Sequence, residues 1–213
     1  MSAERVIEIA RGELSYTENP AGSNRTKYGA AYGLQNQPWC VIFLWWCFRE
    51  AGEAAAFFGG GKTASCGTLL RWYAAQGQTV PVSKARPGDI VLLNFHNGQE
   101  PEHCGLVVGT STNAYIQTIE GNTSPGLEGS QDNGGCVALK WRYARQVVAV
   151  LRPNYKEEQV EKQKDYEGHW AEKYIRWCIE HGLMMGYEDG SFGPDKPVTR
   201  AELATVLRRL EDR

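Results

Sequence analysis

The chain has 213 residues, of which 42% are hydrophobic and 23% are charged, and its formal net charge at pH 7 is −2. This composition is typical of a globular protein and excludes a disordered or fibrous chain. The length leaves room for one domain of ordinary size and a small second one. The slight negative charge gives no general attraction to nucleic acid or to anionic membranes, so we expect no nucleic-acid partner.

Residues 3–14 have apolar side chains at helical spacing and predict an amphipathic helix. A secretory signal would instead need a basic start and an uninterrupted apolar run. We therefore expect a protein that is made in the cytoplasm without a signal peptide, with its six cysteines reduced there. The cysteine spacings contain no Cys-x-x-Cys pair, and we expect neither a metal site nor a cofactor.

Two further helical patterns, 38–51 and 67–76, are followed by short apolar runs that are separated by turns rich in Gly, Asn and Ser. The predicted strands span 90–95, 103–108, 114–119, 137–143 and 147–151. Helices followed by a meandering, mainly antiparallel sheet predict an α+β fold.

The run 154–165 is charged, contains a single aliphatic residue and is predicted to be a linker. A first domain would then cover 1–153, and a small all-α unit of helix–loop–helix form would cover 166–213. In this unit, one helix is expected to end near Gly182. A second helix is expected to start at Thr199, whose hydroxyl group would form a capping box with Glu202.

Cys40 is the best candidate for a nucleophile, because it lies at the predicted start of a helix, just after Pro38. Free N–H groups and the helix dipole stabilise a thiolate there. Trp39 is expected to form an aromatic wall beside it that contacts the substrate. Cys47 lies two turns further along in the apolar interior, where a thiolate is costly.

The candidate base is one of four histidines, two of which, His169 and His181, belong to the C-terminal unit. His103 begins an apolar strand, where a sheet face can fix its ring, whereas His96 lies in a polar turn and is expected to be solvated. Taken alone, a histidine in a strand is more often structural than catalytic. Cys104 points to the opposite face of that strand, so we do not expect it to share a metal ion with His103.

A third group is needed to orient the imidazole and to stabilise its charged form. Glu120 and Asn122 lie at alternate positions at the end of the next predicted strand, so both would point to one face. Glu120 could accept a hydrogen bond from the ring, and Asn122 could assist or bind substrate. The alternative is that both are strand-end residues in water.

Together these residues make 1–152 resemble the CHAP domain, a branch of the NlpC-like cysteine peptidases with a papain-like fold. The resemblance rests on the segments 18–20, 24–29, 38–40, 87–91, 103–107 and 119–122. It implies that Cys40 attacks an amide of peptidoglycan, that His103 is the base, and that Glu120, with Asn122, orients the ring. Some family members bind calcium through an acidic loop before the cysteine, but Glu18 is the only acidic residue of that stretch here, so we do not expect calcium.

Residues 166–213 resemble one S-layer homology (SLH) module, through the segments 168–171, 182–187, 189–195 and 198–202. Such modules bind secondary polymers of the Gram-positive cell wall, often through an arginine at a Thr-Arg-Ala-Glu helix start. The resemblance thus implies a ligand-binding role for Arg200, although the residue could simply lie on the surface of a helix. SLH modules usually occur as three in one chain, so a single copy implies either that three chains associate through it or that its affinity is weak. Association as a trimer would fit the limited core of one copy.

These resemblances imply a peptidoglycan hydrolase that works through a thioester at Cys40, either an N-acetylmuramoyl-L-alanine amidase or an endopeptidase. A wall-binding module without a signal peptide predicts a phage or prophage endolysin of a Gram-positive host. Two alternatives are a wall-binding protein without catalytic activity and a cytosolic thiol amidohydrolase that acts on a small amide.

Overall fold

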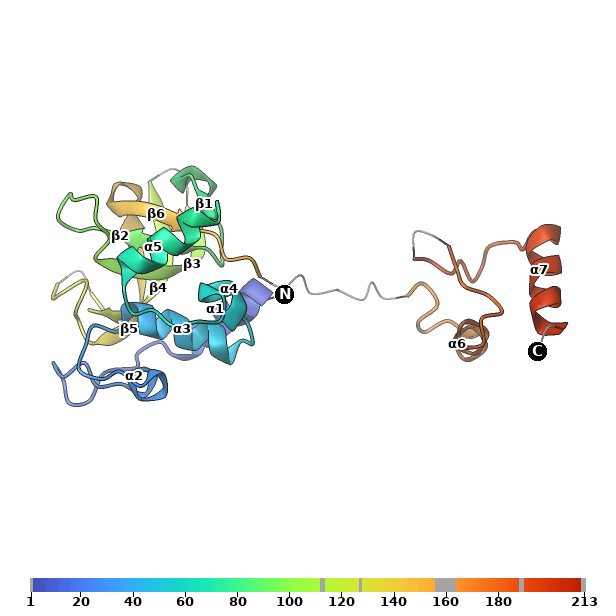
Figure 1. Ribbon diagram of the computed structural model, residues 1–213, viewed down its shortest axis with the longest axis horizontal. Coiled ribbons are helices and arrows are strands. Elements are labelled where there is room, and N and C mark those ends of the chain that lie inside the picture. The colour runs from blue at the N-terminus through green and yellow to red at the C-terminus, as the bar shows by residue number, and fades with distance from the viewer. Residues whose placement is uncertain (1, 112–113, 127, 156–163, 188–189, 212–213) are drawn as a thin grey trace. The chain divides into compact units, whose positions relative to one another are not determined.

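The structure is a computed structural model that describes residues 2–111, 114–126, 128–155, 164–187 and 190–211. The chain divides into two compact units, Met1–Glu158 and Gln159–Arg213 (Figure 1). The predicted linker limits, 154–165, stay a prediction, because 156–163 lie outside the described residues.

The strands of the first unit form a six-stranded sheet in the order β1-β6-β2-β3-β4-β5, in which every neighbouring pair is antiparallel. The strands are β1 (Thr79–Val80), β2 (Ile90–Leu93), β3 (His103–Ser111), β4 (Tyr115–Thr123), β5 (Cys136–Tyr143) and β6 (Val147–Leu151). Strands β2 to β5 follow one another as a meander, and β6 returns to pair with both β1 and β2. This arrangement confirms the predicted α+β class.

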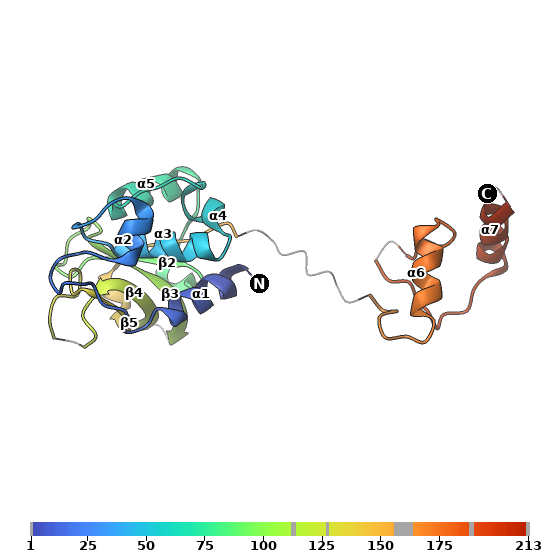
Figure 2. The same ribbon diagram turned by 90° about the horizontal axis from the view of Figure 1, so that it is seen from below.

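The helices of the first unit precede the sheet in the chain. They are α1 (Ser2–Gly12), α2 (Lys27–Tyr32), α3 (Cys40–Glu50), α4 (Ala54–Phe58) and α5 (Cys66–Ala75). Two short 3₁₀ helices, Val82–Lys84 and Ala144–Gln146, lie before β2 and before β6. Helix α3 is apolar on nearly all sides, which is typical of a helix buried in a core. It packs against α1 and α2 and against strands β3 and β4 (Figure 2).

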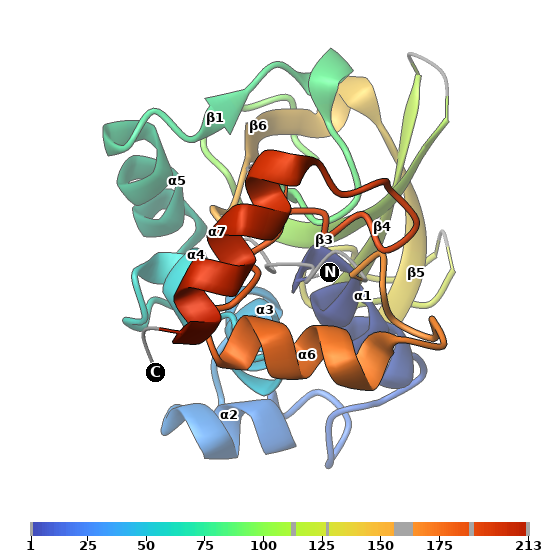
Figure 3. The ribbon, with the colours of Figure 1, turned by 90° about the vertical axis from the view of Figure 1, so that its right-hand side faces the viewer.

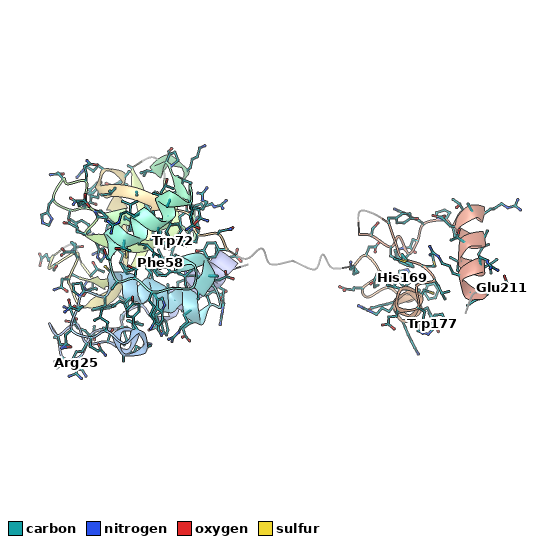
Figure 4. The ribbon with its side chains drawn as sticks, viewed as in Figure 1. Arg25, Phe58, Trp72, His169, Trp177 and Glu211 are labelled. Carbon is teal, nitrogen blue, oxygen red and sulfur yellow. The ribbon has the colours of Figure 1, made fainter. Side chains whose placement is uncertain are left out.

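Two clusters of buried side chains hold this unit together. The larger surrounds α3 and includes Cys104 and Leu106 of β3. The smaller contains Val91, Val107 and their neighbours on the other face of the strands. Helix α4 packs against α5 through Phe58 and Trp72, whose ring centroids are 5.2 Å apart (Figure 4). The sheet therefore has an apolar layer on both faces, and β2 is buried throughout.

The second unit contains α6 (Glu172–Glu180) and α7 (Arg200–Glu211), joined by a turn-rich segment (Figure 3). The capping box predicted at the start of α7 is present: Glu202 N donates to Thr199 Oγ1 over 3.2 Å, and Thr199 N donates to Glu202 Oε2 over 2.7 Å. Little of this unit is buried, since Ile175 is the one buried residue of α6 and α7 has none. None of the described helices is both long enough and apolar enough to span a bilayer.

Candidate active site

Cys40 is the first residue of α3, and Trp39 precedes it as the N-cap. The helix starts with its backbone N–H groups unpaired and with the positive end of its dipole at this position, and both favour a negatively charged sulfur. The residue is only 4% exposed, so the thiol lies in a nearly dry environment where neighbouring dipoles have a strong effect. The helix start predicted for Cys40 is thus confirmed.

The pKa of the Cys40 thiol is held well below its usual value. Hydrogen bonds from the Cys104 and Cys66 thiols are the largest causes, burial acts in the opposite direction, and His103 lowers the pKa further through a hydrogen bond and its positive charge. The opposite holds for Cys47, whose pKa burial raises far above the usual value. Cys40 is therefore the one of these two α3 cysteines that is prepared to act as a nucleophile.

His103 is the first residue of β3 and is completely buried. Its Nε2 lies 3.0 Å from Glu120 Oε2, and Glu120, on β4, is completely buried as well. Nδ1 is therefore the ring nitrogen that remains for Cys40. Nδ1 is buried and has no hydrogen-bond partner of normal geometry among the described residues.

The pKa of His103 is raised to about 9. Burial alone lowers it, but hydrogen bonds with Cys40 and Glu120, together with their negative charges, outweigh that effect. A lowered cysteine pKa beside a raised histidine pKa means that the resting pair is a thiolate and an imidazolium over the neutral range. His103 thus differs from His96, which is exposed and pairs with Glu102 at 2.9 Å in a loop.

Arg142 of β5 completes the buried charge network, although no local pattern in the sequence points to it. Its Nε donates to Glu120 Oε1 over 2.8 Å, and its Nη2 donates to Glu120 Oε2. Thr118 Oγ1 also donates to Glu120 Oε1, over 2.6 Å. Burial raises the pKa of Glu120, but Arg142 and His103 outweigh it and lower the pKa to about 2. The carboxylate is therefore charged whenever it orients the imidazole.

Asn122 does not join this network. It lies at a shift in the β4–β5 register and has a left-handed backbone with φ 61°, so it does not continue the simple alternation that the sequence implied. Its amide nitrogen donates to Asn133 Oδ1 over 3.0 Å, and its Oδ1 is buried without a partner among the described residues. The structure gives it no hydrogen bond to Cys40, His103 or Glu120.

Trp39 is a core residue. Its side chain is completely covered, its Nε1 donates to Glu18 Oε2 over 3.4 Å, and its ring packs against Tyr28 and Phe43. This burial corrects the expectation that Trp39 forms an aromatic wall facing the substrate. A tryptophan beside a nucleophile is not distinguishable by sequence alone from one that anchors the helix start.

Two further cysteines lie beside the nucleophile. Cys66 is the first residue of α5, and Cys104 follows His103 on β3. The sulfur atoms of Cys40, Cys66 and Cys104 all lie within 4.8 Å of one another. Cys104 belongs to the buried cluster around α3. Val107, which alternation places on the same face of β3 as His103, belongs to the other cluster. This agrees with the expectation that Cys104 and His103 point to opposite faces of β3.

Arg200 begins α7 and is exposed. The second unit contains a pocket of about 560 Å³, which is lined by residues of the turn-rich segment and of α7, among them Tyr187, Lys196 and Arg209. Arg200 is not part of that lining. Its predicted role in ligand binding therefore stays a prediction.

The chain is similar to two families of known domains. The model of the CHAP domain matches residues 31–122, and the model of the S-layer homology domain matches residues 164–204. A solved structure titled "The crystal structure of Ly7917" aligns with 72% of this chain and 62% of that chain, at 18% identity and with a TM-score of 0.43.

Several surface proteins are similar over short stretches. A cellulosome-anchoring protein of Acetivibrio thermocellus is 42% identical over 24% of this chain, and cell surface glycoprotein 1 of the same organism is 51% identical over 18%. Outer membrane protein alpha of Thermotoga maritima is 43% identical over 21% of this chain. The matched stretches make up 11%, 2% and 11% of these relatives, so the chain spans a small part of each.

The chain therefore contains a CHAP domain followed by an S-layer homology domain.

Proposed function

We propose that the protein cleaves an amide bond of peptidoglycan, with Cys40 as the nucleophile, His103 as the acid and base, and Glu120 as the group that orients the imidazole. The observation that carries this proposal is the buried, hydrogen-bonded series of His103, Glu120 and Arg142, together with the lowered pKa of Cys40 at the start of α3, to which the charge of His103 contributes. In such an arrangement the thiolate and the imidazolium are already formed before the substrate binds.

In the first step, the Cys40 thiolate attacks the amide carbonyl carbon, and the carbonyl oxygen becomes negatively charged. The unpaired N–H groups in the first turn of α3 are suited to stabilise that oxygen. The His103 imidazolium then gives its proton to the leaving nitrogen, the C–N bond breaks, and a thioester remains on Cys40.

In the second step, neutral His103 takes a proton from a water molecule, and the resulting hydroxide attacks the thioester carbon. The carboxylic acid product leaves, Cys40 becomes a thiolate again, and His103 regains its positive charge. Glu120 stays ionised throughout and fixes the ring in place through Nε2. The same groups can catalyse cleavage between the sugar and Ala, as in an N-acetylmuramoyl-L-alanine amidase, and cleavage within the stem peptide or cross-bridge, as in an endopeptidase.

In this proposal the C-terminal domain binds a secondary polymer of the wall, and Arg200 contacts an anionic substituent of that polymer. An arginine at a helix start offers charge, two parallel N–H donors and nearby backbone N–H groups to such a ligand. The proposal also includes synthesis in the cytoplasm and release to the wall of a Gram-positive host, as in a phage or prophage endolysin.

Replacing Cys40 with Ala tests the catalytic part. We expect clearing of purified Gram-positive cell walls to fall by roughly 10⁴-fold or more, because the thioester can no longer form. The matched control is Cys178→Ala, which removes a cysteine from α6 of the other unit. Wall lysis by Cys40→Ala at a comparable rate would exclude the mechanism. Mass spectrometry of the fragments released by the native protein would show which amide is cut.

A further inference from the structure

The proposed mechanism uses one of three thiols that lie together. Cys40, Cys66 and Cys104 come from α3, α5 and β3, and their sulfur atoms are all within 4.8 Å of one another. Among the described residues, they form the one group of three or more His, Cys, Asp or Glu side chains whose ligand atoms are close enough to share an ion. Neither Cys66 nor Cys104 takes part in bond making in the proposed reaction.

The surroundings of this group are those of a closed ligand site. The three residues are 4%, 7% and 0% exposed, so the sulfur atoms are nearly shielded from water. The group contains sulfur atoms alone, because His103 is not a member of it.

The donor atoms determine which ligand fits. Three sulfur atoms and no carboxylate exclude hard cations such as Ca²⁺ and Mg²⁺, which require oxygen ligands. Zinc binds thiolates at about 2.3 Å, which puts tetrahedral sulfur ligands about 3.8 Å apart. The sulfur atoms, which are now up to 4.8 Å apart, would have to approach one another by about 1 Å to bind the ion. Small changes in the cysteine side-chain torsions and at the helix start are sufficient for this.

We propose that Cys40, Cys66 and Cys104 form a binding site for a thiophilic metal ion of the Zn²⁺ class, and that the bound ion switches the enzyme off by occupying the sulfur of Cys40. Each protonated thiol releases its proton on binding, and the three thiolates donate electron pairs to the ion without any change of oxidation state. The fourth coordination position is left for water. Metal binding does not depend on the proposed function, whereas inhibition rests on it.

Cd²⁺ is a suitable probe of binding, because its thiolate complexes absorb in the ultraviolet. We expect the full-length protein, kept reduced with a phosphine, to take up one tightly bound Cd²⁺ per chain with a thiolate-to-metal band. Excess Zn²⁺ should displace it. Cys66→Ala, Cys104→Ala and Cys40→Ala should each weaken binding by at least about 100-fold, the upper end of what loss of an outer-shell partner causes. Cys136→Ala and Cys178→Ala are the matched controls and should bind like the native protein.

The variants Cys40→Ala, Cys66→Ala and Cys104→Ala, called here the cluster variants, change three different elements. Circular dichroism identifies any of them that fails to fold, and the test uses those that do fold. A missing stoichiometric band in the native protein would overturn the proposal. Equal binding by the native protein and the folded cluster variants would overturn it as well.

Inhibition is measured separately, as wall lysis with increasing Zn²⁺. Lysis by the native protein should be lost near one equivalent of tightly bound Zn²⁺ and should return with EDTA. Cys66→Ala and Cys104→Ala, each compared with its own metal-free activity, should tolerate at least about 100-fold more Zn²⁺. Equal sensitivity of these variants would overturn inhibition through this site. A protein that binds Cd²⁺ through the three thiols but lyses no wall would refute the proposed function and leave the metal site standing.

Discussion

At the scale of single residues, the site is a row of alternating charges inside a core. Arg142 and His103 carry positive charges, and Glu120 and Cys40 carry negative ones, so the row is neutral as a whole. Isolated charges in such a position would cost several kcal/mol each, and neutrality with close hydrogen bonds is what makes the burial tolerable. Changing one member therefore affects both the stability of the fold and the protonation of the others.

The pH dependence of activity follows from this coupling. Activity requires thiolate and imidazolium together, so kcat/KM should form a bell whose acid limb reflects the lowered pKa of Cys40 and whose alkaline limb lies near the His103 pKa of about 9. In Glu120→Gln, the negative charge that helps to raise the His103 pKa is lost. The alkaline limb should then move to lower pH, which rate profiles on soluble wall fragments measure. A limb that stays in place would show that Glu120 does not act on His103.

Arg142→Met tests the innermost charge of the row. It leaves the buried Glu120 carboxylate with His103 as its one remaining ion-pair partner among the described residues and should destabilise the fold by about 3–5 kcal/mol in urea unfolding at pH 7. Arg145→Met is the control, since Arg145 is exposed and packs over the Tyr143 ring.

The sign of the effect of pH on stability follows from the lowered Glu120 pKa. The folded value is about 2 and the ordinary value is 4.5, so the stabilisation is present above pH 4.5 and is lost as the pH falls towards 2. In Arg142→Met, the pKa of Glu120 in the folded state should rise towards its ordinary value. The free energy of unfolding of this variant should therefore fall less on acidification than that of the native protein. Equal acid sensitivity of the native protein and the variant would contradict the assigned pairing.

How much of the site the sequence predicts depends on the range of the contacts. The helix start at Cys40 was predictable from local signals, and His103 and Glu120 followed from the resemblance to CHAP domains. Arg142 lies 22 positions from Glu120, and only the antiparallel pairing of β4 with β5 brings the two together. The meeting of Cys66 and Cys104 at Cys40 likewise depends on the packing of three separate elements, which no spacing in the sequence reveals.

At the scale of elements, β5 reverses the usual pattern of a half-buried strand. Its apolar residues Leu139, Trp141 and Tyr143 are exposed, while Lys140 and Arg142 between them are buried. Lys140 Nζ donates to Ser124 O over 2.9 Å, and Arg142 binds Glu120. The strand was predicted, but alternation alone places its apolar residues inside. The charged network of the site determines the orientation instead.

Short helices were the other feature that the sequence did not predict. Helix α2 has 6 residues and α4 has 5, which is too short for an apolar periodicity to be recognised. Thr26 caps α2, and Gly33 and Gly59 end the two helices in left-handed conformations. Longer elements such as α3 and α5 were predicted to within two residues at each end.

Helix α3, which carries Cys40, lies against β4, which carries Glu120 and pairs with the strand of His103, and Gly121 of β4 allows this close approach. A Cβ atom on Gly121 would lie 2.6 Å from Phe43 Cβ and 2.8 Å from Trp39. We expect Gly121→Ala to separate the strand from the helix, to destabilise the fold by about 1–3 kcal/mol and to lower wall lysis by more than that loss of folded protein explains. Gly12→Ala is the matched control, because nothing lies within 4 Å of its added Cβ. A fully active, stable Gly121→Ala would show that the spacing is set elsewhere.

At the scale of the whole molecule, the two units differ in how much they bury. The first has two apolar clusters around its sheet, whereas α7 in the second unit has no buried residue. Trp170, Tyr174 and Met185 are 83%, 64% and 75% exposed. A helix–loop–helix of this size has little core of its own. Exposed apolar side chains in that number are typical of a surface that another protein covers.

Self-association of the full-length protein is the prediction that follows from this exposure. Leu203, Leu207 and Leu210 are 49%, 57% and 52% exposed, and their spacing puts them along one side of α7. We expect sedimentation equilibrium to show a concentration-dependent trimer, because three copies of one module could bury these leucines together. Leu207→Glu should shift the equilibrium towards monomer by placing a charge in the contact. Trp141→Glu, which removes an equally exposed apolar residue (50%) from the other unit, should leave it unchanged. A protein that stays monomeric at all concentrations, or a shift caused by Trp141→Glu instead, would rule out association through α7.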